Sequence, residues 1–250
     1  MSTFDIKSVG RLADAKPRPD GAASPCSACS VRHMTVCAPL NPMELAEFSS
    51  ITTKASMAAG TPVFDEGEPA DHVFNVTEGL VKVYKLLPDG RRQVTGFLIA
   101  GDFLGLANEE VYAYCAETVT PAKLCRFSRR KLEGMLQRYP QVERQLLSLA
   151  SHELAAAQEQ MLLLGRKTAK EKIASFLLRL SARYGKRGLE ANPLHLPMSR
   201  NDIGDYLGLT TETVSRTFTQ LKTAGSIRLL PHSKVELSDL DALEEIAEGL

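Results

Sequence analysis

The pattern of apolar and polar positions divides the chain into a strand-rich first part and a helical second part. Between Gly60 and Gly105, short apolar runs recur about every ten residues, with a glycine between one run and the next. Pro88-Asp89-Gly90 lies between two of these runs and favours a hairpin turn. Short strands in this spacing predict an antiparallel β-roll, which we place at 41–138.

After Pro140 the apolar period lengthens to that of a helix. Six residues recur at alternating steps of three and four, as in a coiled-coil seam: Leu147, Ala150, Leu154, Ala157, Met161 and Leu164. Alanine at alternate seam positions favours two helices in close approach, and no charge interrupts the seam. We therefore predict a dimerisation helix at 139–168 and a homodimer. The alternative is a helix that packs on its own β-domain.

The segment 169–250 has the signals of a winged helix-turn-helix. Ser199 can cap a helix that has Asp202 at its third position, Gly208 supplies a tight turn, and Thr210 or Thr211 can cap a second helix. Two later apolar runs flank Pro231-His232-Ser233 and suggest a small β-wing. The predicted fold class is therefore α+β: a β-roll, a long dimerisation helix and a C-terminal winged helix-turn-helix.

The second of these two helices has one apolar and one polar face. At the rotation of an α-helix, Val214, Phe218 and Leu221 fall together, and polar side chains occupy the opposite side. Arginine can bond guanine, glutamate can accept from cytosine, and serine can contact a base or a phosphate. We predict binding to double-stranded DNA through a set of residues on this helix and its predecessor: Ser199, Arg200, Thr211, Glu212, Ser215, Arg216 and Thr219.

Charge and composition refine this picture. The 30 basic and 30 acidic residues cancel, but the segment Arg166–Arg187 has eight basic residues against Glu171 alone, so we expect it to supply phosphate contacts. The five histidines are scattered, and no catalytic constellation stands out, which excludes an enzyme.

Residues 1–25 are polar, and we expect them to form a flexible tail. They contain no apolar stretch of signal-peptide or membrane-span length, so we expect a cytoplasmic protein away from membranes.

Three of the five cysteines lie in one short segment, 26–40, in the spacing Cys26-x2-Cys29-x7-Cys37. Three thiolates in one loop need a fourth ligand to complete a zinc site or an iron–sulfur cluster. His33 lies between them and keeps a zinc site open as an alternative, and a thiol–disulfide switch is another. Cys115, beside Tyr114, is expected to be a small core residue.

The order of a glycine-punctuated β-roll, a long helix and a winged helix-turn-helix resembles the CRP/FNR family of bacterial regulators, over nearly the whole chain from Cys26. Glu212-Thr213-Val214-Ser215-Arg216 is similar to the E-x-x-S-R signature of the FNR branch. The resemblance implies a palindrome close to TTGAT-N4-ATCAA, with Arg216 on G, Glu212 on the opposing C and Ser215 on a neighbouring T. It also implies that the hairpin Leu87–Gly90 is a candidate surface for RNA polymerase.

The same resemblance extends to the cysteines. Cys125 matches the position of the family's fourth ligand, and the spacing of the other three is similar to that of alphaproteobacterial FNR-like proteins. A [4Fe–4S] cluster on Cys26, Cys29, Cys37 and Cys125 is implied, and with it DNA binding that is lost when oxygen destroys the cluster. The alternative is a regulator of this family that has structural zinc or a thiol–disulfide switch and responds to another effector.

One stretch departs from the family's pattern. Members that bind cyclic nucleotides have a Gly-Glu pair and an Arg-Ser pair around the ribose and phosphate. This chain has Gly105-Leu106-Ala107-Asn108 and then Tyr112-Ala113-Tyr114-Cys115-Ala116. A buried phosphate would lack its charge partner, so we expect no cyclic nucleotide.

Overall fold

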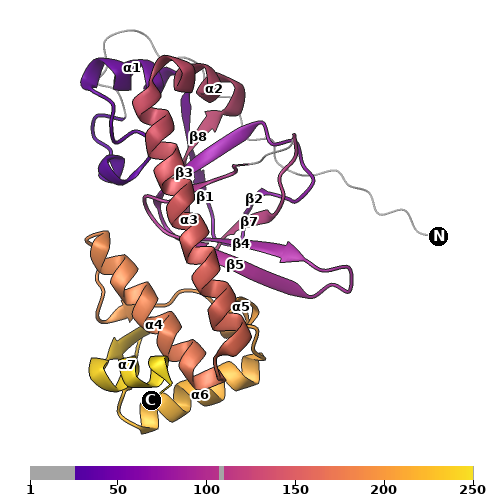
Figure 1. Cartoon of the computed structure of the whole chain (residues 1–250), viewed down its shortest axis with the longest axis vertical. Helices are drawn as coiled ribbons and strands as arrows, with labels where there is room; N and C mark the ends of the chain where they lie inside the picture. Colours follow the sequence, from indigo (N-terminus) through magenta and orange to yellow (C-terminus); the bar gives the residue numbers. More distant parts are fainter. Residues whose placement is uncertain (1–25, 107–109, 250) are drawn as a thin grey trace, which may run out of the picture.

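The computed structural model describes residues 26–106 and 110–249, so the tail predicted at 1–25 lies outside the described residues. A β-sheet body and a smaller helical body lie at opposite ends of one long helix (Figure 1). That helix, α3, spans Pro140–Arg166. No helix in the described ranges is long and apolar enough to cross a membrane.

The first body is a roll of two four-stranded sheets. One sheet has the strand order β1 (Thr52–Met57), β8 (Ala122–Ser128), β3 (His72–Glu78) and β6 (Phe103–Leu104). The other has the order β2 (Pro62–Phe64), β7 (Cys115–Thr118), β4 (Val81–Leu86) and β5 (Arg92–Leu98). All pairings within these sheets are antiparallel.

Two short helices cover one end of the roll. Helix α1 is Pro42–Ser50, and it begins at a capping box in which Asn41 accepts from the backbone N–H of Glu44. Helix α2 is Arg129–Arg138 and leads into α3. Before α1, a loop with a short 3-10 turn at Arg32–Met34 holds the first three cysteines. Its buried residues pack with α1, β8 and the start of α3 in a single apolar cluster.

The second body follows α3. Its helices are α4 (Ala169–Lys186), α5 (Arg200–Leu207), α6 (Thr211–Thr223) and α7 (Leu240–Glu248). A three-stranded sheet has the order β10 (Ile227–Leu230), β11 (Lys234–Leu237) and β9 (Leu194–His195). Its hairpin turns at His232 and Ser233, whose φ angles of 59° and 57° are those of a tight primed turn. The fold class predicted from the sequence is confirmed.

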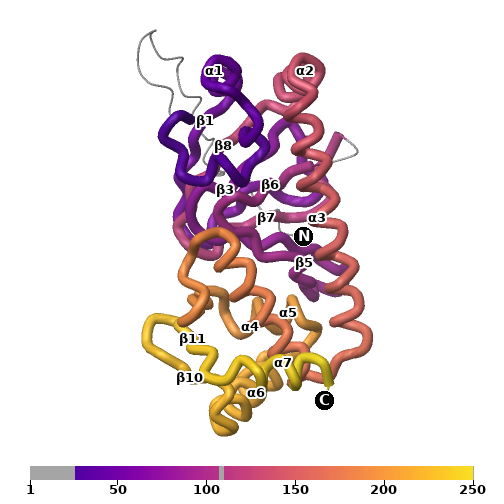
Figure 2. The backbone as a smooth tube through the Cα atoms, turned by 60° about the vertical axis from the view of Figure 1, so that its left-hand side comes forward, coloured from indigo at the N-terminus to yellow at the C-terminus, as the bar shows by residue number. Residues whose placement is uncertain are grey.

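The two bodies share a hydrophobic core. Leu80, Val94 and Phe97 of the roll belong to the same buried cluster as the cores of α4, α5 and α6. The ring of Tyr206 on α5 lies 5.2 Å from that of Phe97 and 5.7 Å from that of Phe176 on α4. Figure 2 shows α4 and α5 directly below the roll and beside α3. The helix-turn-helix is therefore packed on its own roll and not merely attached through α3.

Candidate DNA interface and cysteine cavity

The predicted recognition surface is the outer face of α6. Glu212, Ser215, Arg216 and Thr219 are exposed, whereas Val214, Phe218 and Leu221 are buried. The Arg216 guanidinium lies 3.8 Å from the Glu212 carboxylate on an exposed surface, a distance at which neither group is fixed. Both side chains can therefore turn to base edges, as the amphipathic pattern predicts.

Two glycines set the angle between α5 and α6. Gly208 ends α5 in the left-handed region, with φ 63°. Gly204 lies where α5 meets the turn, and a Cβ there would be 2.6 Å from the carbonyl oxygen of Leu209. Thr210 then caps α6 by accepting from the backbone N–H of Thr213. The close approach at Gly204 excludes any side chain, so these two positions fix the turn.

The remaining predicted DNA residues lie around the ends of the two helices. Ser199 caps α5, and its hydroxyl is 2.6 Å from Asp202 Oδ2. Arg200 is half-buried, with its guanidinium carbon 3.4 Å from the centroid of the Phe218 ring. The Thr211 hydroxyl donates to Asn201 Oδ1 at 3.1 Å. Ser199 and Thr211 are exposed on the same body as α6, but their hydroxyls already have protein partners.

The expectation that the basic segment Arg166–Arg187 supplies phosphate contacts is wrong for Arg183 and Arg187. Both guanidinium groups form ion pairs with Asp102, a buried carboxylate in the turn after β5. Arg183 also donates to the carbonyl of Phe97 at 2.7 Å. These arginines join α4 to the roll because a buried carboxylate needs compensating charge.

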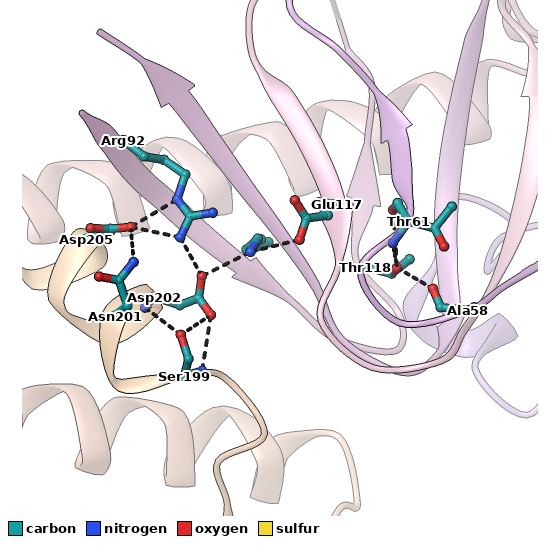
Figure 3. A network of polar contacts seen from close by, with 10 residues as sticks. Ala58, Thr61, Arg92, Glu117, Thr118, Ser199, Asn201, Asp202 and Asp205 are labelled. Atoms are coloured by element: carbon teal, nitrogen blue, oxygen red, sulfur yellow. Dashed lines mark hydrogen bonds and ion pairs between the residues drawn. The ribbon is translucent and has the colours of Figure 1, made fainter. Parts of the chain in front are cut away.

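A second ion-pair cluster joins α5 to the roll (Figure 3). Lys82 Nζ, buried on β4, lies 3.0 Å from Asp202 Oδ1 and 2.9 Å from Glu117 Oε1. Arg92 on β5 reaches Asp202 at 2.8 Å and Asp205 at 2.9 Å. Burial acts to raise the pKa of Asp202, but hydrogen bonds from Ser199 and Lys82 outweigh it and lower that pKa below its usual value of 3.8.

Sequence reasoning missed this interdomain clamp, formed by Lys82, Arg92, Asp202 and Asp205. One signal was available: Lys82 interrupts the apolar run from Leu80 to Val83. A lysine in the apolar, buried half of a strand indicates a buried partner. The partner's identity was not accessible, because Asp202 lies 120 residues further along the chain.

The cysteines meet in one cavity. Cys26, Cys29 and Cys37 from the loop and Cys125 from β8 line a space of about 290 Å³. Cys26, Cys37 and Cys125 are buried, and Cys29 is half-buried. The structure therefore brings together the four cysteines that the sequence assigns to one site, although 88 residues separate Cys37 from Cys125 by number.

Burial governs the thiols of this cavity. It raises the pKa of Cys37 to about 12, and the neighbouring Cys26, Cys125 and Cys29 add to the effect. Burial likewise raises the pKa of Cys125 to about 12, with Cys26 and Cys29 contributing. Burial therefore favours the protonated thiol at Cys37 and Cys125 at neutral pH.

The residues that line the cavity can be compared with the ligands that metal centres take. Within 26–106 and 110–249, no group of three or more His, Cys, Asp or Glu is arranged so that it could hold a metal ion. His33 is exposed and is not among the residues that line the cavity. Four thiols are the kind and number of ligands that either an iron–sulfur cluster or a zinc ion takes. Cys115 is buried elsewhere, on β7, and its sulfur accepts from the backbone N–H of Glu66 at 3.3 Å.

The cysteine loop and α1 contact the start of α3. Gln145 on α3 donates to the carbonyl of Thr35, in the loop, at 3.4 Å. Gln141 donates to Glu44 on α1 at 3.1 Å, and the Tyr139 hydroxyl bonds Glu47. The cysteine loop and α1 are therefore hydrogen-bonded directly to the first turns of the long helix.

Comparison with known proteins decides the family. Residues 54–139 match the cyclic nucleotide-binding domain, and residues 171–246 match the Crp-like helix-turn-helix domain. The chain is 40% identical to the nitrogen fixation regulation protein FixK of Bradyrhizobium diazoefficiens over 89% of this chain and 93% of that protein. It is 40% identical to the transcriptional activator protein FnrL of Cereibacter sphaeroides over 89% of this chain and 91% of that protein. The structure of FixK2 from Bradyrhizobium japonicum aligns with TM-score 0.73 and 39% identity over 78% of this chain and 97% of that one.

The chain belongs to the CRP/FNR family. It is accordingly a DNA-binding transcription regulator and not an enzyme.

In this CRP/FNR chain the predicted seam lies along one side of α3. Leu147, Leu154 and Met161 are 67%, 62% and 69% exposed, which is unusual for large apolar side chains on one stripe. Ala157 is exposed and Ala150 is half-buried on the same stripe. Leu164, the last residue of the predicted seam, is half-buried and packs against the helix-turn-helix core beside Gly208, and the seam as a whole stays a prediction.

The CRP/FNR roll is tightly filled where it departs from the nucleotide-binding pattern. Phe64 and Tyr112 stack with their ring centroids 3.8 Å apart, and Phe74 lies 5.9 Å from Phe64. The Tyr112 hydroxyl donates to the carbonyl of His72 at 2.7 Å. Ala107 and Asn108 of that pattern lie outside the described residues. The expectation that no cyclic nucleotide binds stays a prediction.

Proposed function

We propose that this chain is a homodimeric transcription activator whose DNA binding requires a [4Fe–4S] cluster and is lost in oxygen. The observation that carries the proposal is the cavity that Cys26, Cys29, Cys37 and Cys125 line together. The names of the similar FnrL and of Anr from Pseudomonas aeruginosa, 35% identical to this chain over 88% of it, describe transcriptional activators.

The four cysteines hold the cluster in this proposal, and the cluster, when bound, supplies oxygen-labile bonds between the loop and β8. The loop contacts α3 through Thr35 and Gln145. A loop held in place favours the position of α3 in which its exposed stripe pairs with that of a second copy. Loss of the cluster frees the loop and weakens that pairing.

In the dimer, the paired α3 helices place the two copies of α6 so that each contacts one half-site of the same palindrome. The proposed site is TTGAT-N4-ATCAA, in which Arg216 contacts G, Glu212 the opposing C and Ser215 a neighbouring T. The support is the exposure of all three side chains on one face of α6. Activation involves RNA polymerase at the β4–β5 hairpin, where Leu86 and Leu87 are exposed.

The test is anaerobic purification, followed by iron and zinc analysis, visible absorption and DNA-binding measurements before and after air. We expect about four irons per chain, a visible band that bleaches in air, and DNA binding lost with it. Cys125→Ala should lose the band, whereas the matched control Cys115→Ala should keep it. Colourless protein with one zinc and air-insensitive DNA binding would overturn the sensor, and loss reversed by dithiothreitol without iron would favour a thiol–disulfide switch.

A further inference from the structure

The wall of the cysteine cavity contains a buried amide that the proposed function leaves unused. Asn75 on β3 lines the cavity and is 2% exposed. Within the described part of the chain, no hydrogen-bond partner is available to Asn75 Oδ1. Buried side-chain polar groups nearly always have a hydrogen-bond partner, because a buried polar atom without one costs free energy. The position of Asn75 thus indicates a partner that the polypeptide itself does not supply.

Strand register places this amide beside Cys125. On the three adjacent strands β1, β8 and β3, Lys54 pairs with Cys125, and Cys125 pairs with Asn75. Directly paired residues of antiparallel strands point to the same face of the sheet. The cavity is on this face, since all three residues line it. Lys54, Cys125 and Asn75 thus form a row across the three strands, in which Lys54 is exposed and Asn75 is buried.

We infer that Asn75 is a positioning residue whose amide N–H group donates a hydrogen bond to a sulfur atom of the bound cluster or of Cys125. The inference rests on the proposed function. The atom without a partner is the amide oxygen, an acceptor, and a sulfur would also accept. The inference therefore takes the amide in its rotated orientation, with the N–H2 group in the place of Oδ1. Hydrogen bonds to the sulfurs are among the factors that set the potential and stability of such clusters.

This role predicts effects of opposite sign in two forms of the protein. Asn75→Leu keeps the size of the side chain and removes its polar atoms. In the cluster-free protein, the variant loses an unsatisfied amide, so its thermal unfolding midpoint should be equal to or higher than that of the wild type. In the cluster-loaded protein, the visible band should decay in air about fivefold faster, the factor that corresponds to one net hydrogen bond.

The experiment follows both forms of Asn75→Leu together with two further variants. Asn75→Asp places a carboxylate beside an anionic cluster and should shift the reduction midpoint to a more negative potential than in the wild type. Ser56→Ala is the matched control, because it removes an exposed hydroxyl from the same cavity. That control should leave both the decay rate and the potential unchanged.

Three outcomes overturn the inference. A cluster-free Asn75→Leu protein with a lower unfolding midpoint than the wild type would show that Asn75 is a structural residue. A normal decay rate in cluster-loaded Asn75→Leu, with four irons in the wild type, would remove the role of Asn75 and leave the proposed function intact. A wild-type protein that takes up no iron would overturn both.

Discussion

At the scale of single residues, the arginines that join the two bodies differ in their surroundings from Arg216, the arginine predicted to contact DNA. The arginines that hold the two bodies together, Arg92, Arg183 and Arg187, each bond a carboxylate of the other body. Arg216 has no such fixed partner, since its nearest carboxylate is 3.8 Å away on an exposed helix. An arginine with a free fork of donors can bond two acceptors of one guanine.

We therefore expect Arg216→Lys to bind DNA with reduced discrimination. Lysine keeps the charge but loses the paired donors, so preference for G·C at the contacted position should fall by about 1–3 kcal/mol. The measurement compares affinities for the palindrome and for one with that base pair replaced. Arg228→Lys, on the wing and paired with Glu236, serves as the control. An unchanged preference in Arg216→Lys would refute the assignment.

The carboxylate of Asp202 supports a second residue-level prediction. Asp202→Asn removes the negative charge that Lys82 and Arg92 share, and it weakens the cap of α5. We expect the free energy of unfolding at pH 7 to fall by about 1–3 kcal/mol. Asp205→Asn should lower the free energy of unfolding by less, because Asp205 is more exposed and of these two basic residues bonds only Arg92.

The pH dependence of this difference follows from the direction of the pKa shift. The pKa of Asp202 is lower in the folded protein than its usual 3.8. Its stabilising contribution is therefore fully present above pH 3.8 and is lost as the pH falls through the folded value. Unfolding midpoints of wild type and Asp202→Asn should converge below pH 3.8. A difference that persists there would contradict the ion-pair origin.

At the scale of elements, α3 carries two different faces. One packs on the roll and the cysteine loop through Val142 and on the helix-turn-helix through Leu163. The other presents Leu147, Leu154 and Met161 to solvent. Exposure of a stripe of large apolar side chains to water costs free energy, and the proposed pairing with a second copy would remove that cost.

We expect Leu154→Glu to give a monomer with normal folding. A carboxylate in the seam opposes its own copy across the two-fold axis, and dimerisation should weaken by at least about 2 kcal/mol. Sedimentation measures the association, and circular dichroism measures the fold. Ala156→Glu, exposed on another side of the same helix, is the matched control and should remain dimeric. Dimeric Leu154→Glu would place the interface elsewhere.

At the scale of the whole molecule, two ends are coupled through one helix. The cysteine loop contacts the first turns of α3, and the helix-turn-helix packs on its last turns and on the roll. The ion pairs of Lys82 and Arg92 with Asp202 hold the helix-turn-helix firmly on the roll. In the proposed function, a signal at the cysteine loop would therefore act first on the start of α3, which the loop contacts.

Hydrogen exchange provides the corresponding test. When air removes the cluster, amide exchange should quicken in 26–40 and in the first turns of α3, where the loop contacts it. Exchange in α5 and α6 should stay unchanged, because their core and the clamp do not include the loop. Faster exchange that begins in α6 would show that the signal travels through the helix-turn-helix instead.

Local rules were sufficient for much of this protein. The capping pair Ser199–Asp202, the left-handed Gly208, the wing turn and the two faces of α6 follow from neighbouring residues, and all are present. The strand runs likewise appear where glycines separate them. These features depend on hydrogen bonds and periodicities within a few residues, so the sequence by itself determined them.

Only the tertiary structure decided what distant residues do. It assigned Arg183 and Arg187 to Asp102, turned Leu164 to the helix-turn-helix core, and placed Asn75 beside Cys125. The physical reason is that a buried charge or amide is satisfied by whichever group the packing brings near it. Strand order and domain docking set that choice, and no periodicity along the chain encodes it.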